Sequence, residues 1–87
     1  MSTIEKKIRP KFFDLVLSGS NHFEVRVANF NVNVGDIILL REWDPETMSY
    51  TGRSVEKTVS FVNKVELDKI GDVDEIVEKG LYIMEIE

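Results

Sequence analysis

The residues best suited to chemistry stand two positions apart in one short segment: Glu24 and Arg26. Apolar residues alternate with them, namely Phe23, Val25 and Val27. That alternation predicts a strand on which Glu24 and Arg26 share one face while the apolar residues anchor the other. The donor fork of Arg26 suits a phosphate, a carboxylate or a base edge, and Glu24 can accept from an amino group or orient Arg26. The pair is therefore a candidate ligand site, although a surface ion pair without further role fits the same spacing.

Two aromatic residues, Trp43 and Tyr50, flank a predicted hairpin loop, and Arg41 and Arg53 lie close to them in the sequence. Proteins that bind single-stranded RNA stack its bases on aromatic rings that lie near cationic groups. Aromatic pairs also stabilise a hairpin without any ligand. Both interpretations stay open for this pair, and Trp43 joins the candidate ligand-binding residues.

The charge of the chain is unevenly distributed. Its net value of −5 opposes strong non-specific binding to nucleic acid. Residues 1–28 nevertheless contain five basic and three acidic residues, so the remainder carries −7. A locally basic surface can steer an anionic ligand. We therefore expect Lys7, Arg9 and Lys11 to line the basic side of a ligand site, with an ordinary solvated surface as the alternative.

The composition of the 87-residue chain excludes several classes of site and protein. With no cysteine and a single histidine, His22, we expect no disulfide framework, no metal site and no cofactor. No apolar run reaches the length of a membrane span, and no apolar stretch follows the N-terminal lysines as it would in a signal peptide. We expect one domain over residues 1–87, a cytoplasmic location and no contact with membranes.

Periodicity and turn residues predict the elements. Pro10 suits the first turn of a short helix, whose Phe12 and Phe13 are expected in the core, and Gly19 can end that helix with a left-handed backbone. Strands are predicted over Thr3–Arg9, from Phe23, and over Ile37–Trp43, Arg53–Val65 and Leu81–Ile86. Within the fourth strand, one face is predicted to hold Val55, Val59, Phe61 and Val65. A second short helix, capped by Asp72, is possible over Val73–Lys79.

This order of elements shows no alternation of strand, helix and strand, so a doubly wound parallel sheet is not expected. The sequence predicts an α+β fold that is mainly β. Its several strands and short connections favour a small barrel or a curled mixed sheet, since closure removes exposed strand edges.

A resemblance to a known family rests on the same segment. Gly19, Glu24 and Arg26 match the signature Gly-x-Lys-x-x-Glu-x-Arg of the ASCH family, a branch of the PUA-like superfamily, and Asn21 stands where that family has lysine. Further segments resemble a small uncharacterised ASCH subfamily of bacteria and phages: Lys7–Phe13, Val34–Ile37, Leu40–Thr47 and Tyr50–Arg53. The resemblance implies a PUA-like β-barrel, with Glu24 and Arg26 at a cleft between helix and barrel.

Three functions follow as hypotheses. The first is a binding module for RNA or a modified nucleoside, whose ligand-binding residues are Glu24, Arg26, Asn21, Lys7, Arg9, Lys11 and Trp43. The second is a small amidohydrolase acting on acetylated cytidine, as some ASCH proteins are. The amide at position 21 cannot act as base or nucleophile, which argues against an enzyme and leaves Glu24 as the catalytic candidate. The third is a protein-interaction adaptor, like the ASCH portion of activating signal cointegrator proteins, whose acidic Glu66–Glu87 segment would meet a basic partner.

Overall fold

The computed structural model describes residues 1–66 and 79–87. In chain order the elements are β1 (Thr3–Ile8), α1 (Pro10–Leu17), β2 (Phe23–Val27), β3 (Ile37–Asp44), β4 (Ser49–Val65) and β5 (Leu81–Ile86). The described part of the chain is thus an α+β fold that is mainly β, as predicted. The helix expected over 73–79 falls on residues outside this description, apart from Lys79.

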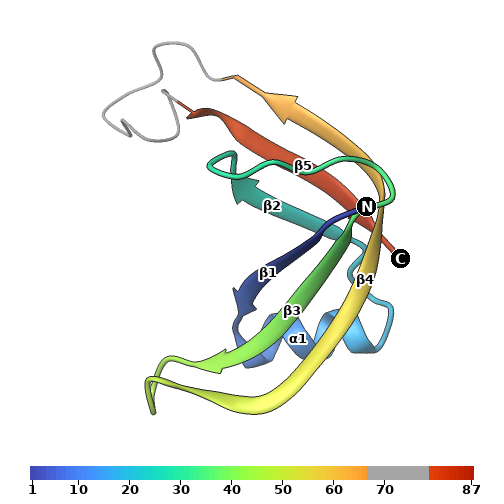
Figure 1. Cartoon of the computed structure of the whole chain (residues 1–87). Helices are drawn as coiled ribbons and strands as arrows, with labels where there is room; N and C mark the ends of the chain where they lie inside the picture. The colour runs from blue at the N-terminus through green and yellow to red at the C-terminus, as the bar shows by residue number, and fades with distance from the viewer. Residues whose placement is uncertain (67–78) are drawn as a thin grey trace.

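The five strands form one sheet in the order β1-β3-β4-β5-β2. β1 runs parallel to β3, and every other neighbouring pair is antiparallel. The 17-residue β4 pairs with β3 through its first part and with β5 through its last part. It is strongly bent and connects the two halves of the sheet (Figure 1). β1 and β2 are the two edges, and no backbone ladder joins them in the described residues. The sheet is therefore strongly curled but open.

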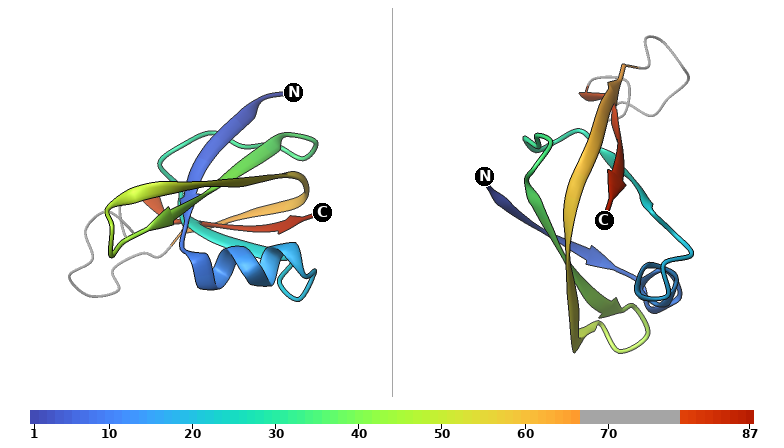
Figure 2. Two further views of the ribbon diagram at one scale, coloured as in Figure 1. Left: turned by 90° about the horizontal axis from the view of Figure 1, so that it is seen from below. Right: turned by 90° about the vertical axis from the view of Figure 1, so that its right-hand side faces the viewer.

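The helix α1 begins and ends where its sequence predicts. Arg9 is extended, as a residue before proline prefers, and Pro10 occupies the first turn. Gly19 has a φ of +78°, which lets the chain turn back, and the Ser20 and Asn21 amides both donate to the Leu15 carbonyl. This tight C-terminal turn delivers the chain directly into β2, so that α1 lies beside the ends of β1 and β2 (Figure 2).

The core lies on the inner side of the curled sheet. It consists of Ile8, Phe13, Val16, Val32, Ile38, Leu40, Val59, Met84 and Ile86. The prediction that both helix phenylalanines belong to the core was wrong for Phe12, which is exposed, whereas Phe13 is fully buried. Adjacent residues on a helix point about 100° apart, so only Phe13 can share the inward face with Val16.

The orientation of β2 is the reverse of the predicted one. Glu24 is only 7% exposed, whereas Phe23 and Val25 are 52% and 58% exposed. The apolar residues therefore do not anchor β2, and its polar pair points into the curl of the sheet. Alternation correctly separated the two faces, but pairing with β5, in which Glu24 lies opposite the buried Met84, determines which face is inside.

The apolar face predicted for β4 is interrupted by a bulge. Its register with β5 shifts between Val59 and Phe61, so Ser60 is an extra residue in the ladder. Beyond this bulge the inward position passes to Val62, which packs against the core, and Phe61 points outward and is exposed. The predicted apolar face therefore breaks at the bulge, because an inserted residue reverses the alternation that follows it.

A charged network ties α1 to the hairpin of β3 and β4. The Glu42 carboxylate is buried and accepts from Arg53 at 2.8 Å from Nε and 2.6 Å from Nη2, and Thr51 donates its hydroxyl to the same carboxylate. Arg53 Nη2 also reaches Asp14 on α1 at 3.0 Å. The hydrogen bonds from Arg53, and then the one from Thr51, hold the pKa of Glu42 below its usual range.

The ionised Glu42 carboxylate is expected to make the stability of the fold depend on pH in the acid range. A Glu residue in an unfolded chain has a pKa of about 4.3, and the folded-state pKa of Glu42 is lower, so its charge stabilises the fold above that pH. The stabilisation is lost as the pH falls through the folded-state pKa. Glu42→Gln is therefore expected to lower the Tm by several degrees at neutral pH and to flatten the decline of the Tm in acid.

The measurement is the Tm by circular dichroism from neutral pH down to acid, with Glu56→Gln as the matched control because Glu56 is an exposed carboxylate on β4. The control should reproduce the wild-type curve. A Glu42→Gln curve that runs parallel to the wild type would contradict the stabilising role of the ionised carboxylate.

Candidate functional site

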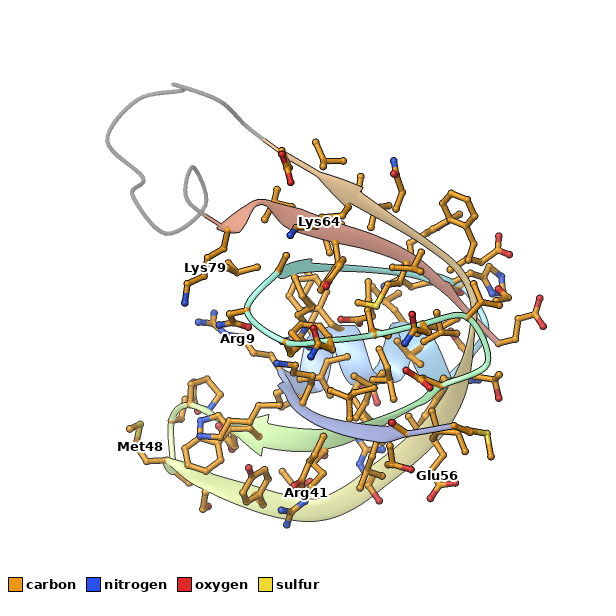
Figure 3. All side chains as sticks on the ribbon, turned by 45° about the horizontal axis from the view of Figure 1, so that its top comes forward. Arg9, Arg41, Met48, Glu56, Lys64 and Lys79 are labelled. Carbon is orange, nitrogen blue, oxygen red and sulfur yellow. The ribbon has the colours of Figure 1, made fainter. Side chains whose placement is uncertain are left out.

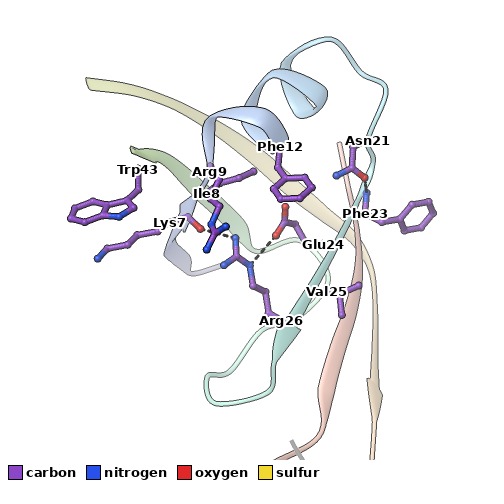
Figure 4. Close-up of a pocket in the computed structure, with 10 residues that line it drawn as sticks. All are labelled: Lys7, Ile8, Arg9, Phe12, Asn21, Phe23, Glu24, Val25, Arg26 and Trp43. Carbon is purple, nitrogen blue, oxygen red and sulfur yellow. Dashed lines mark hydrogen bonds and ion pairs between the residues drawn. The ribbon is translucent and has the colours of Figure 1, made fainter. Parts of the chain in front are cut away.

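A cavity of about 420 Å³ lies where the two edge strands approach each other beside α1 (Figure 4). Its walls come from the end of β1 and the residue that follows it, from α1, from the turn before β2, from β2 and from β3. The lining residues are Lys7, Ile8, Arg9, Phe12, Asn21, Phe23, Glu24, Val25, Arg26 and Trp43. A volume of this size is within the range of pockets that hold small ligands.

Arg26 forms the floor of this cavity together with Glu24. Its Nε donates to Glu24 Oε2 at 2.9 Å, and its Nη2 donates to the backbone carbonyl of Lys7 at 2.8 Å. The first contact stays within β2, whereas the second crosses from β2 to β1. One guanidinium therefore bridges the two sheet edges that no backbone ladder joins in the described residues.

Several polar atoms of the site remain available to a ligand. Glu24 Oε1 makes no hydrogen bond to any described residue, and no buried side-chain oxygen or nitrogen in that part of the chain lacks a partner. Glu24 Oε1 must therefore be open to the cavity. Within the same residues Arg26 Nη1 has no partner either, and Asn21 uses only its Oδ1, which accepts from the Phe23 amide at 3.1 Å. The cavity thus presents one acceptor, Glu24 Oε1, and two donor groups, Arg26 Nη1 and the side-chain amide nitrogen of Asn21.

The rim of the cavity is cationic. The Lys7 ammonium lies 3.9 Å from the centre of the Trp43 ring, and the exposed Arg9 makes no ion pair with any described residue. Lys6 lies on the opposite side of β1, where its ammonium sits 3.8 Å from the centre of the Phe30 ring. Burial, and then the nearby charge of Arg26, lower the pKa of Lys6. Three cations and one carboxylate line the cavity, so its net charge is positive in an acidic protein.

The structure brings six of the seven predicted ligand-binding residues together around this cavity: Lys7, Arg9, Asn21, Glu24, Arg26 and Trp43. Lys11 is placed elsewhere. It lines a neighbouring hollow between the start of α1 and the β3–β4 hairpin, in the company of Asp44 and Glu46. Lys11 stands in the first turn of α1, on the side of the helix that faces the β3–β4 hairpin, whereas Arg9 and Phe12 line both hollows.

The sequence did not predict that the aromatic rings of Phe12 and Phe23 line the cavity. Both were assigned to buried faces, and both lie on the cavity instead. A signal for Phe12 was present. Five of the eight α1 residues are large and apolar, which is more than one buried stripe of a two-turn helix can hold. No comparable signal marked Phe23.

Residues 1–66 and 79–87 contain no group of three or more His, Cys, Asp or Glu side chains that could hold a metal ion. In the same residues no helix is both long and apolar enough to cross a membrane.

Comparison with known proteins gives the family. A family model described as a domain of unknown function, DUF3850, matches residues 3–86. The chain belongs to this family. Over 58 residues, this DUF3850 chain is 40% identical to an uncharacterized 12.9 kDa protein in the GpA 3′ region of Escherichia phage P2. That match covers 67% of the chain and 51% of the phage protein, so the chain spans about half the length of the relative.

A solved structure has a similar fold. The crystal structure of the hypothetical protein PH0355 matches this DUF3850 chain with a TM-score of 0.71 and 14% identity, over 100% of this chain and 98% of the other. At that identity the likeness concerns the fold alone. The descriptions of the family, the phage protein and the solved structure name no activity.

Proposed function

We propose that this protein is a binding module whose cavity takes RNA or a modified nucleoside. The observation that carries the proposal is the pairing of Glu24 with Arg26 at the floor of the cavity. Glu24 Oε1 is an acceptor that is open to the cavity and has no partner among the described residues, and Arg26 Nη1 is a donor beside it. An acceptor next to a donor complements the edge of a base, where an amino group stands beside a ring nitrogen or a carbonyl.

The remaining walls suit the other parts of a nucleotide. The rings of Phe12, Phe23 and Trp43 offer apolar surface to a planar base. Lys7 and Arg9 place two cations at the rim, where they would attract a phosphate. A positively charged cavity in a protein with a net charge of −5 also favours an anionic ligand at this position over the rest of the surface.

The resemblance of Gly19–Arg26 to the ASCH signature supports the same site. In that family a cleft lies between helix and barrel, and here the cavity lies between α1 and the curled sheet. We propose that this fold is a PUA-like barrel whose seam, between β1 and β2, is bridged by Arg26 in place of a backbone ladder.

Binding can be followed through the single tryptophan, Trp43, which lies in the cavity wall. Titration of its fluorescence with short RNAs, nucleoside monophosphates and nucleosides is expected to saturate for at least one of these classes. Arg26→Lys keeps the positive charge but loses the planar fork that contacts Glu24 and Lys7. We expect affinity to fall by about tenfold or more, because one hydrogen bond between charged groups contributes about that much.

A lysine pair gives the matched control. Lys7→Ala removes a cation from the cavity rim, whereas Lys11→Ala removes the same charge from the neighbouring hollow. Lys7→Ala should weaken binding and reduce its salt dependence, and Lys11→Ala should leave both near the wild type. Equal losses in the two variants would show that only the overall charge matters, and would remove the cavity from the proposal.

The amidohydrolase hypothesis has one structural observation in its favour. Lys7 lies in the same cavity as Glu24, so an amine is present although position 21 is an amide. We expect the wild type to release no acetate from acetylated cytidine above the rate without protein. Acetate release by the wild type that is lost in Glu24→Gln would establish the enzyme instead, whereas activity gained only in Asn21→Lys would reveal a binding site derived from an enzyme.

The adaptor hypothesis rested on the acidic segment Glu66–Glu87. Residues 67–78 lie outside the description, so the structure adds no support to it and it stays a prediction.

A further inference from the structure

A second group of aromatic and cationic side chains lies on the outer face of the sheet. Lys7 on β1 is paired with Arg41 on β3, and Trp43 on β3 is paired with Tyr50 on β4. Paired residues in neighbouring strands project from the same face, and Arg41 and Trp43 are two positions apart on one strand. We call Lys7, Arg41, Trp43 and Tyr50 the outer cluster.

The members of the outer cluster are in direct contact. The rings of Trp43 and Tyr50 meet edge to face, with centres 5.0 Å apart and planes at 80°. The Lys7 ammonium lies 3.9 Å from the Trp43 centre and 5.8 Å from the Tyr50 centre, and the Arg41 guanidinium carbon lies 3.8 Å from the Tyr50 centre. Each ring therefore carries a cation at its surface.

The outer cluster is also accessible. Tyr50 is 37% exposed, and Arg41 points away from the sheet near the β3–β4 hairpin, whose tip carries Met48 (Figure 3). Arg41 is held at 2.8 Å by Glu5, so the cluster contains two cations against one neighbouring acid. Tyr50 is thus exposed and Trp43 half-buried, and each ring has a cation over it. Aromatic rings next to cations form a surface on which bases stack and phosphates bind.

Lys7 and Trp43 belong to both the outer cluster and the cavity wall. The outer cluster therefore adjoins the cavity: Tyr50 does not line the cavity itself, but it contacts Lys7 and Trp43, which do. A ligand that filled only the cavity would leave Tyr50 and Arg41 unused.

We infer that the ligand is a single strand of nucleic acid of two or more nucleotides, and not a free nucleoside. One base occupies the cavity against Glu24 and Arg26, the adjoining base stacks on Tyr50, and the phosphate between them lies near Lys7 and Arg41. This inference rests on the proposed function, because it extends the same site, and it names the strand as the ligand class.

The test compares chain lengths. The four homotrinucleotides of RNA and the four nucleoside monophosphates are titrated against the protein at one fixed salt concentration. We expect the best trinucleotide to bind about fivefold or more tightly than the best monophosphate, since one stacked base contributes at least that factor. Deoxytrinucleotides of the same sequences show whether the strand is RNA or DNA, and tighter binding of either kind supports the inference.

Tyr50→Ala and Tyr50→Phe separate stacking from a role in hairpin stability. Tyr50→Ala should reduce the ratio of trinucleotide to monophosphate affinity, and Tyr50→Phe should retain it, because the stacking ring is kept. A trinucleotide that binds no more tightly than a monophosphate would overturn the inference and leave the cavity proposal intact. A Tyr50→Ala variant that retains the wild-type ratio would overturn it equally, and failure of every nucleotide to bind would remove the proposed function as well.

Discussion

The guanidinium of Arg26 joins the two edge strands of an otherwise open sheet. Its contact with the Lys7 carbonyl crosses the seam between β2 and β1, and its contact with Glu24 fixes the carboxylate at the floor of the cavity. Edge strands normally expose unpaired backbone groups, and a side chain that bridges them keeps the curl of the sheet without closing it. Within residues 1–66 and 79–87, Arg26 bridges the seam where no backbone ladder joins β1 to β2, and the cavity lies beside this bridge.

The orientation of β2, with its charged pair inside and its apolar side chains outside, is energetically unfavourable and indicates a functional role. Its carboxylate and guanidinium are turned inward, while Phe23 and Val25 face solvent. Burial of an ionised group is unfavourable unless it is paired, and here Glu24 has one oxygen satisfied by Arg26 and the other open to the cavity. The Glu42 carboxylate on β3 differs, since Arg53 and Thr51 satisfy both its oxygens. Glu24 therefore keeps one oxygen available to a ligand, whereas both oxygens of Glu42 are used in hydrogen bonds within the fold.

Local signals in the sequence predicted the helix α1, the strands and most of the residues that line the cavity, although β4 begins at Ser49 and not at Arg53. Pro10 and Gly19 correctly predicted the ends of α1, and the spacing of Glu24 and Arg26 correctly placed them on one face. What the sequence did not reveal depends on pairing between distant strands. The inward face of β2 is decided by its register with β5, and the reversal at Phe61 is decided by the extra residue at Ser60. The position of Lys11 outside the cavity depends on how the start of α1 packs beside the β3–β4 hairpin, which no local pattern encodes.

The most direct test of the account is a map of backbone amide shifts by NMR while a short single-stranded RNA is added to the wild-type protein. The account predicts progressive, saturable shifts that begin at Lys7, Glu24 and Arg26, on both sides of the seam, and extend to Trp43. Shifts confined to the opposite end of the sheet, around Asp36 and Thr58, or an unchanged spectrum at millimolar RNA, would contradict it.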